Sequence, residues 1–224
     1  MMLGETEISF VADAEVRGRP EDFFPGSGWT GGEIVARVGS FLIRTPERTV
    51  LVDLGLGPGG ELLDNLGRHD VTPADVDLVV FTHLHRDHVG WTGAFPNARY
   101  LVDEREWAYW CARPGGVGPD PDRVLAPLTG AIGSLGALPP GLEAVPAPGH
   151  TPGHTCLLVT DPGTADRVLL LGDLLHDPAQ FDHPGWHFRS DTDPALAAYS
   201  RREVLARFRD ARTALAGAHF QGLT

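Results

Sequence analysis

Lysine is missing from this sequence: all 18 basic residues among the 224 are arginines, against 30 acidic residues, for a formal net charge of −12. Without lysine, Schiff-base chemistry and a phosphate-loop lysine are both excluded. A chain this acidic also lacks the cationic surface that binds nucleic acids and anionic lipids. We therefore expect neither a nucleic acid nor a membrane as partner.

Cysteines and long apolar runs are also scarce. Cys111 and Cys156 stand 45 positions apart, which matches no zinc or redox spacing of the CxxC type. No run approaches the roughly 18 apolar residues that suggest a membrane-spanning helix. Residues 1–11 carry two glutamates and no basic region before an apolar run, unlike a signal peptide. We expect a cytoplasmic protein with two separate buried thiols.

The length suits one domain, which we expect to cover residues 1–224. Scattered glycines and prolines indicate many short elements joined by tight turns. Strands are expected at 33–44, 49–54, 77–82, 99–102, 142–145, 155–160, 168–171 and 214–218, the first two as an antiparallel pair. Helices are expected at 62–66, 104–111, 124–128 and from 193 to about 212. This order suggests two sheets covered by helices on the outside.

Histidines stand out in what the sequence does contain. Of ten histidines, His83, His85 and His88 share the string HLHRDH with Asp87, directly after the apolar strand expected at 77–82. Neutral imidazole nitrogens and carboxylate oxygens are ligands that zinc prefers. Four such groups are too many for one tetrahedral ion with an open position, so the motif predicts two ions.

Three further candidate ligands follow other expected strands. His150 comes after the strand at 142–145, Asp173 after the strand at 168–171, and His219 at the end of the last strand. Each alone is a weak signal. Together with HLHRDH they indicate a metal site built from four loops at one edge of a sheet.

In this combination the chain resembles the metallo-β-lactamase superfamily over nearly its whole length. The matching segments are HLHRDH, GHTPGH from His150, LGD at Asp173, GAHF at His219, and VDLGLG, which contains Asp53. The resemblance implies an α/β fold: a four-layer αβ/βα sandwich with two mixed β-sheets, outer helices, and metals in a cleft at one edge.

The resemblance also implies two divalent metal ions, for which we expect zinc. One would be held by His83, His85 and His150 and the other by Asp87, His88 and His219, with Asp173 bridging them. Asp53 is expected to hydrogen-bond the metal loop rather than to bind metal.

Within the superfamily, the segment GDLLHDPAQFDHPGW at 172–186 and the arginine-bearing segment after it are similar to methyl parathion hydrolase and related lactonases. The resemblance therefore implies a dinuclear zinc hydrolase that opens small neutral esters or lactones, with phosphotriesters as a further option, by attack of a metal-bridging hydroxide. Asp173 or Asp87 would take up the proton and return it to the leaving alkoxide. His176, where quorum-quenching lactonases often have tyrosine, would either polarise the carbonyl or only line the cleft.

Other interpretations stay open at this point. The same fold could house a mononuclear iron sulfur dioxygenase, a glyoxalase-type thioesterase, or a non-catalytic, metal-stabilised binding protein. Trp91 replaces a usual glycine and could wall the pocket or lie in the core. The chain ends five residues after His219, which suggests a trimmed C-terminus or a shortened sheet edge. We expect a small neutral substrate as partner and allow for a homodimer.

Overall fold

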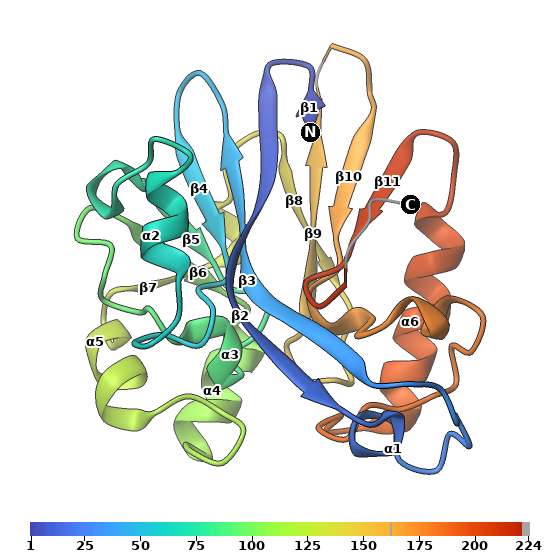
Figure 1. Ribbon diagram of the computed structural model, residues 1–224. Helices are drawn as coiled ribbons and strands as arrows, with labels where there is room; N and C mark the ends of the chain where they lie inside the picture. The colour runs from blue at the N-terminus through green and yellow to red at the C-terminus, as the bar shows by residue number, and fades with distance from the viewer. Residues whose placement is uncertain (162, 221–224) are drawn as a thin grey trace.

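The computed structural model describes residues 1–161 and 163–220, and it has two mixed β-sheets between layers of helices, as expected (Figure 1). Within these residues, the strands of the larger sheet follow one another in chain order: β1 (Met2–Leu3), β2 (Thr6–Gly18), β3 (Ile34–Arg44), β4 (Thr49–Val52), β5 (Leu78–Val80), β6 (Arg99–Val102) and β7 (Ile132–Ser134). Strands β1 to β4 pair antiparallel, and β4 to β7 pair in parallel.

The smaller sheet has the order β11-β10-β9-β8. Its strands are β8 (Leu142–Pro146), β9 (Thr155–Thr160), β10 (Arg167–Leu170) and β11 (Thr213–Ala216). Strands β8, β9 and β10 pair antiparallel, and β11 adds to β10 in parallel.

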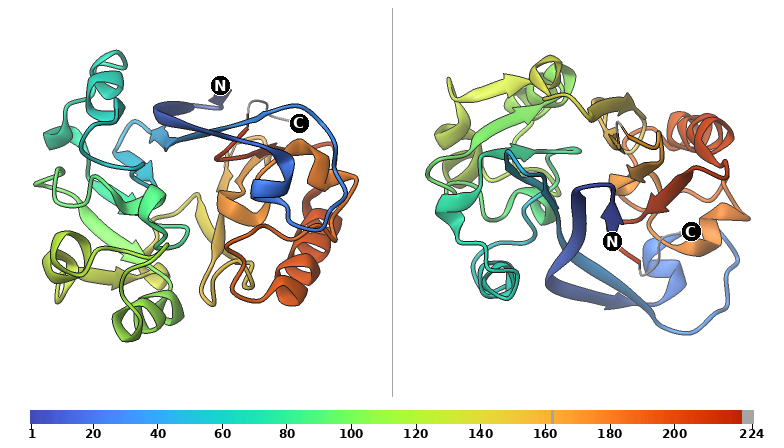
Figure 2. Two further views of the ribbon diagram at one scale, coloured as in Figure 1. Left: turned by 60° about the horizontal axis from the view of Figure 1, so that its bottom comes forward. Right: turned by 90° about the horizontal axis from the view of Figure 1, so that it is seen from above.

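Helices cover the outer face of each sheet, as the turned views in Figure 2 show. On the side of the larger sheet lie α2 (Leu62–Gly67), α3 (Arg86–Val89), α4 (Glu104–Ala112) and α5 (Ala126–Leu128). The long helix α6 (Pro194–Phe208) covers the smaller sheet, and α1 (Pro20–Phe23) follows β2. Short 3₁₀ segments cover Pro73–Asp75, Leu135–Ala137, Gly172–Leu174 and Pro178–Phe181, and a π-helical turn covers Pro121–Leu125.

Side chains along one strand alternate between two apolar cores. Val50 and Val52 of β4 pack between the sheets, while Leu51 packs beneath the outer helices. In β10, Val168 joins the central core and Leu169 the core under α6. Because both faces of these strands are covered, each needs a continuous apolar run, and such runs are what the sequence shows.

The expected elements differ from the structure in several places. Strands β1, β2 and β7 were not expected, because β2 mixes charged with apolar residues and β1 and β7 have only two and three residues. Helix α6 ends at Phe208 rather than near Arg212. Its continuation is blocked because the Asp210 carboxylate accepts hydrogen bonds from the Arg212 N–H and the Thr213 hydroxyl, and β11 then begins.

The two cysteines differ from each other. Cys156 is buried as expected, its thiol donates to the Leu171 carbonyl at 3.3 Å, and burial raises its pKa. Cys111 is exposed instead, because the last turn of α4 presents it away from the core. None of the helices in the described part of the chain has the length and apolar content to cross a membrane.

Candidate metal centre

Four loops that follow strands meet at one edge of the two sheets and carry all seven predicted ligands. The structure places these side chains in two groups, and within each group the candidate ligand atoms lie within 4.8 Å of one another. The first group is His83, His85, His150 and Asp173, and the second is Asp87, His88 and His219.

Asp173 lies between the two groups, and each of its carboxylate oxygens faces one of them. Its Oδ1 is 3.1 Å from Nε2 of His88 and 2.9 Å from Nε2 of His219. Its Oδ2 is 3.1 Å from Nε2 of His150 and 3.7 Å from Nε2 of His83. A carboxylate in this position can bind one cation with each oxygen.

Among the residues that the structure describes, two buried nitrogens in this cluster have no hydrogen-bond partner. They are the Nε2 atoms of His83 and His85. Burial and neighbouring imidazoles hold the pKa values of His83 and His85 well below their usual range, so both rings offer lone pairs. Burial alone would raise the pKa of Asp173, but the surrounding imidazoles hold it well below its usual range. Buried polar atoms without partners are energetically costly. Neutral imidazole nitrogens gathered around a carboxylate are ligands that fit a divalent metal.

Asp53 binds the back of the HLHRDH loop, the role expected from the sequence. Its carboxylate accepts hydrogen bonds from Nδ1 of His88 at 2.8 Å and from the Thr82 N–H at 2.8 Å. Its backbone has φ +62°, which turns the chain sharply after β4. Fixing Nδ1 of His88 in this way leaves Nε2 directed at the cluster.

Two other candidate ligands are oriented in the same manner. Nδ1 of His150 lies 2.8 Å from Asp191 Oδ1, and Nδ1 of His219 lies 2.6 Å from the Arg37 carbonyl. Asp191 was not singled out from the sequence. It stands 41 residues from His150, and a lone aspartate before a helix start carries no signal of this contact.

His176 contacts Asp173 and is held by stacking. Its Nε2 lies 3.0 Å from Asp173 Oδ2. The ring stacks on Phe188, with centroids 3.6 Å apart and planes at 10°, and lies nearly parallel to the ring of His219. Burial lowers the pKa of His176 to about 4, so the ring is neutral, and its buried Nδ1 has no hydrogen-bond partner within residues 1–161 and 163–220.

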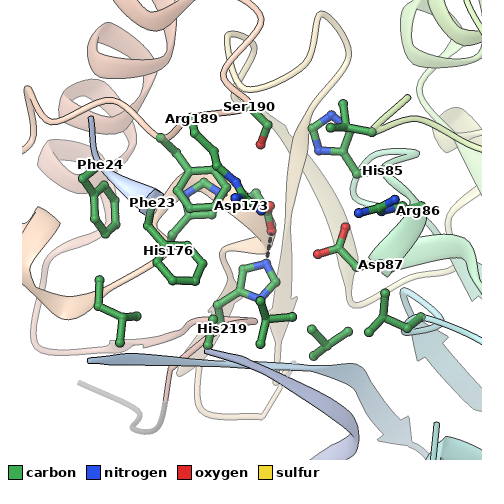
Figure 3. Close-up of a pocket in the computed structure, with 17 residues that line it drawn as sticks. Phe23, Phe24, His85, Arg86, Asp87, Asp173, His176, Arg189, Ser190 and His219 are labelled. Carbon is green, nitrogen blue, oxygen red and sulfur yellow. Dashed lines mark hydrogen bonds and ion pairs between the residues drawn. The ribbon is translucent and has the colours of Figure 1, made fainter. Parts of the chain in front are cut away.

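A pocket of about 130 Å³ opens beside the cluster, between the β2–β3 pair with α1 and the segment after His176 (Figure 3). His85, Asp87, Asp173, His176 and His219 form its polar floor. Its walls are mostly apolar, from Val16, Phe23, Phe24, Ile34, Ala36, Val38, Leu56, Val117 and Phe188, with Arg86, Arg189 and Ser190 completing the lining.

Comparison with known proteins identifies the family. Residues 37–217 match the family model described as metallo-beta-lactamase superfamily. The chain belongs to the metallo-beta-lactamase superfamily. The resemblance seen in the sequence is thereby confirmed.

Relatives within the superfamily include lactonases. Metallo-beta-lactamase domain-containing protein 1 of Xenopus laevis is 36% identical over 180 residues, which are 78% of this chain and 69% of that protein. N-acyl homoserine lactonase AttM of Azorhizobium caulinodans is 36% identical over 113 residues, 45% of this chain and 42% of that lactonase. The chain thus spans less than half of AttM.

A solved structure shares the fold over the entire chain. AidC, a dizinc quorum-quenching lactonase in complex with a product, superimposes with a TM-score of 0.84 at 23% identity. The match covers 100% of this chain and 91% of that chain.

Two further residues have clear places in this superfamily fold, and one of them, Trp91, was left open by the sequence. Trp91 does not line the pocket: its indole N–H donates to Asp13 Oδ1 at 2.9 Å and its ring packs on the outer core. His154 lies behind Asp173, whose N–H it accepts at Nε2 at 2.9 Å. Burial lowers the pKa of His154 to about 3, so it serves as a neutral acceptor.

Proposed function

We propose that the chain, acting as one domain, is a dinuclear zinc hydrolase that opens small neutral lactones or esters. One observation carries the proposal: the two oxygens of Asp173 face two separate groups of metal-ligand side chains, at the floor of an apolar pocket. The lactonases among the relatives support the reaction class, and the dizinc lactonase that shares the fold supports two zinc ions.

In this proposal, His83, His85 and His150 would hold one ion and Asp87, His88 and His219 would hold the other, with Asp173 able to contribute to both. When bound, two such ions lower the pKa of a shared water towards neutrality and polarise the carbonyl oxygen of the substrate.

The side chains of the pocket divide the remaining tasks. Both oxygens of Asp173 already have close partners, whereas the Asp87 side chain is 30% exposed and lines the pocket. Asp87 is therefore the better placed of the two carboxylates to pass a proton to the leaving alkoxide. The apolar walls, with Phe23 and Phe24, receive the apolar part of the substrate. Because His176 contacts Asp173, we infer that it positions this carboxylate rather than polarising the carbonyl group of the substrate.

Elemental analysis of the purified protein, followed by a substrate panel with and without a chelator, tests the proposal. We expect about two zinc per chain. Chelator-sensitive turnover of a lactone or an aryl ester should exceed that of thioesters and phosphotriesters. One iron per chain with oxidation of a sulfur compound would favour the dioxygenase. Bound metal with no turnover of any substrate would favour the non-catalytic alternative.

A further inference from the structure

Glu106, in the first turns of α4, is fully buried, and the metal chemistry described above does not use it. Its exposed fraction is 0%, and burial raises its pKa although several hydrogen bonds act in the opposite direction. No ion pair to Glu106 is present among the described residues. A carboxylate buried in this way needs other partners to offset its desolvation.

Those partners are backbone groups of two different metal-binding loops. Oε1 accepts the N–H of Leu84 at 2.9 Å, and Oε2 accepts the N–H of Gly153 at 3.0 Å. Leu84 stands between His83 and His85, and Gly153 stands three residues after His150. One carboxylate therefore joins the two loops that supply the histidines of the first group.

Packing against α4 fixes the second of these loops independently of the hydrogen bonds. A Cβ atom placed on Gly153 would lie 2.4 Å from the backbone nitrogen of Glu106 and 2.6 Å from its Cβ. Only glycine allows the loop to approach the helix this closely.

Trp110, one turn further along α4, completes the arrangement. Its indole N–H donates to Oε1 of Glu106 at 2.7 Å, and its ring lies 5.4 Å from the ring of His85. Trp110 thus holds the carboxylate in place and packs against one of the histidines that this carboxylate positions.

The second group has a different anchor. His88 is fixed by Asp53 and His219 by the Arg37 carbonyl, and neither contact includes α4.

We propose that Glu106 is a positioning residue that sets the distance of His83 and His85 from His150, so that one of the two metal sites depends on it and the other does not. This inference rests on the proposed two-ion centre.

Zinc titration of the metal-free protein against a chromophoric chelator tests the inference. Glu106→Gln keeps the volume but places an amide NH₂ against a backbone N–H. Glu104→Gln makes the same chemical change at an exposed position of the same helix and is the matched control. The ion at the first group is identified by its loss in His150→Ala. We expect Glu106→Gln to weaken the binding of that ion by about 10–100-fold and to change the binding of the other ion little. Glu104→Gln should bind both ions nearly as the wild type does.

Cobalt(II) substitution gives a second readout, because ligand-field absorption should change for one ion only. Equal zinc affinities in Glu106→Gln and Glu104→Gln would overturn the inference. Equal weakening of the binding of both zinc ions, together with a lower unfolding temperature of the metal-free protein, would also overturn the inference. Such a result would indicate that Glu106 has a merely structural role. If Glu106→Gln does not fold, Trp110→Phe decides: a smaller weakening of the binding of the same ion supports the inference, and no change rejects it.

Failure of the proposed function would appear in the substrate assays of the wild-type protein and not in the zinc titration of the variants. A wild-type protein that binds two zinc ions but hydrolyses no lactone or ester contradicts the function, while the zinc titration of the variants still tests Glu106.

Discussion

Asp173 is the residue on which the centre depends. The Nε2 atoms of His88, His150, His176 and His219 lie within 3.1 Å of its carboxylate, and Nε2 of His83 lies at 3.7 Å. A single anion cannot satisfy so many imidazoles unless cations share the site. Its backbone is also fixed, because His154 accepts its N–H.

Replacing Asp173 by alanine should remove metal and activity together, because each proposed ion loses one ligand and the imidazoles lose their shared anion. We expect zinc content to fall from about two towards zero and turnover to fall by at least about 100-fold. Asp182→Ala, an exposed aspartate nine residues further along the same segment, should change neither. Elemental analysis and steady-state kinetics provide the measurements. Full activity with two ions retained would disprove the bridging role.

At the scale of elements, the loop between β8 and β9 is held against the start of α6. The N–H groups of Thr192 and Asp193 donate to the carbonyls of His150 and Gly149, each at 2.9 Å. The Ser200 hydroxyl donates to the Pro148 carbonyl at 2.6 Å. The long helix thus positions His150 as well as covering the smaller sheet.

Gly149→Ala should therefore disturb the metal centre from outside it. Gly149 has φ +132°, and an added Cβ would lie 2.1 Å from the Ala197 nitrogen of α6. We expect a loss of about 1–3 kcal/mol in the free energy of unfolding, together with weaker zinc binding. Gly67→Ala is the control, because a Cβ there meets nothing within 4 Å. Denaturant unfolding and zinc titration measure the two effects, and a Gly149→Ala protein equal to the control in both would refute the role of this contact.

At the scale of the molecule, residues far apart in the chain close the site. β3 lies beside the segment after β11: the Arg37 N–H donates to the His219 carbonyl at 3.0 Å, and the Arg37 guanidinium donates to the Phe220 carbonyl at 2.9 Å. The proposed ligands come from 83–88 in the half with the larger sheet and from 150–219 in the half with the smaller sheet. Bound metal would therefore link the two halves.

Removing metal should lower the stability of the whole fold as well as abolish activity. With free zinc about 1,000-fold above its dissociation constant, linkage predicts about 4 kcal/mol of added stability, or a rise in Tm of roughly 10 °C. Calorimetry with chelator, then with zinc or magnesium added back, measures this. Zinc should restore both Tm and activity, whereas magnesium should restore neither, because imidazole ligands disfavour it. An unchanged Tm after complete removal of metal would contradict the proposed link between the halves.

Much of the fold and of the candidate site could be predicted from local pattern. The apolar runs of β4, β5, β9 and β10 identify buried strands, and HLHRDH directly after one of them identifies a ligand loop. β2 escaped prediction because its charged residues obscure its alternation, and its role depends on pairing with β3. Asp191 and Glu106 escaped because the loop groups that they contact lie 22 to 47 residues away, and a lone carboxylate carries no local signal.

The sequence alone determined the family resemblance, the residues able to bind metal and the order of the main elements, because these follow from residue type and short-range spacing. Only the tertiary structure decided that Trp91 packs against the outer core rather than the pocket, that His176 contacts Asp173, and that Glu106 joins two loops. Each of these depends on which backbone and side-chain groups come within hydrogen-bonding distance when the sheets pack, and short-range spacing does not specify that.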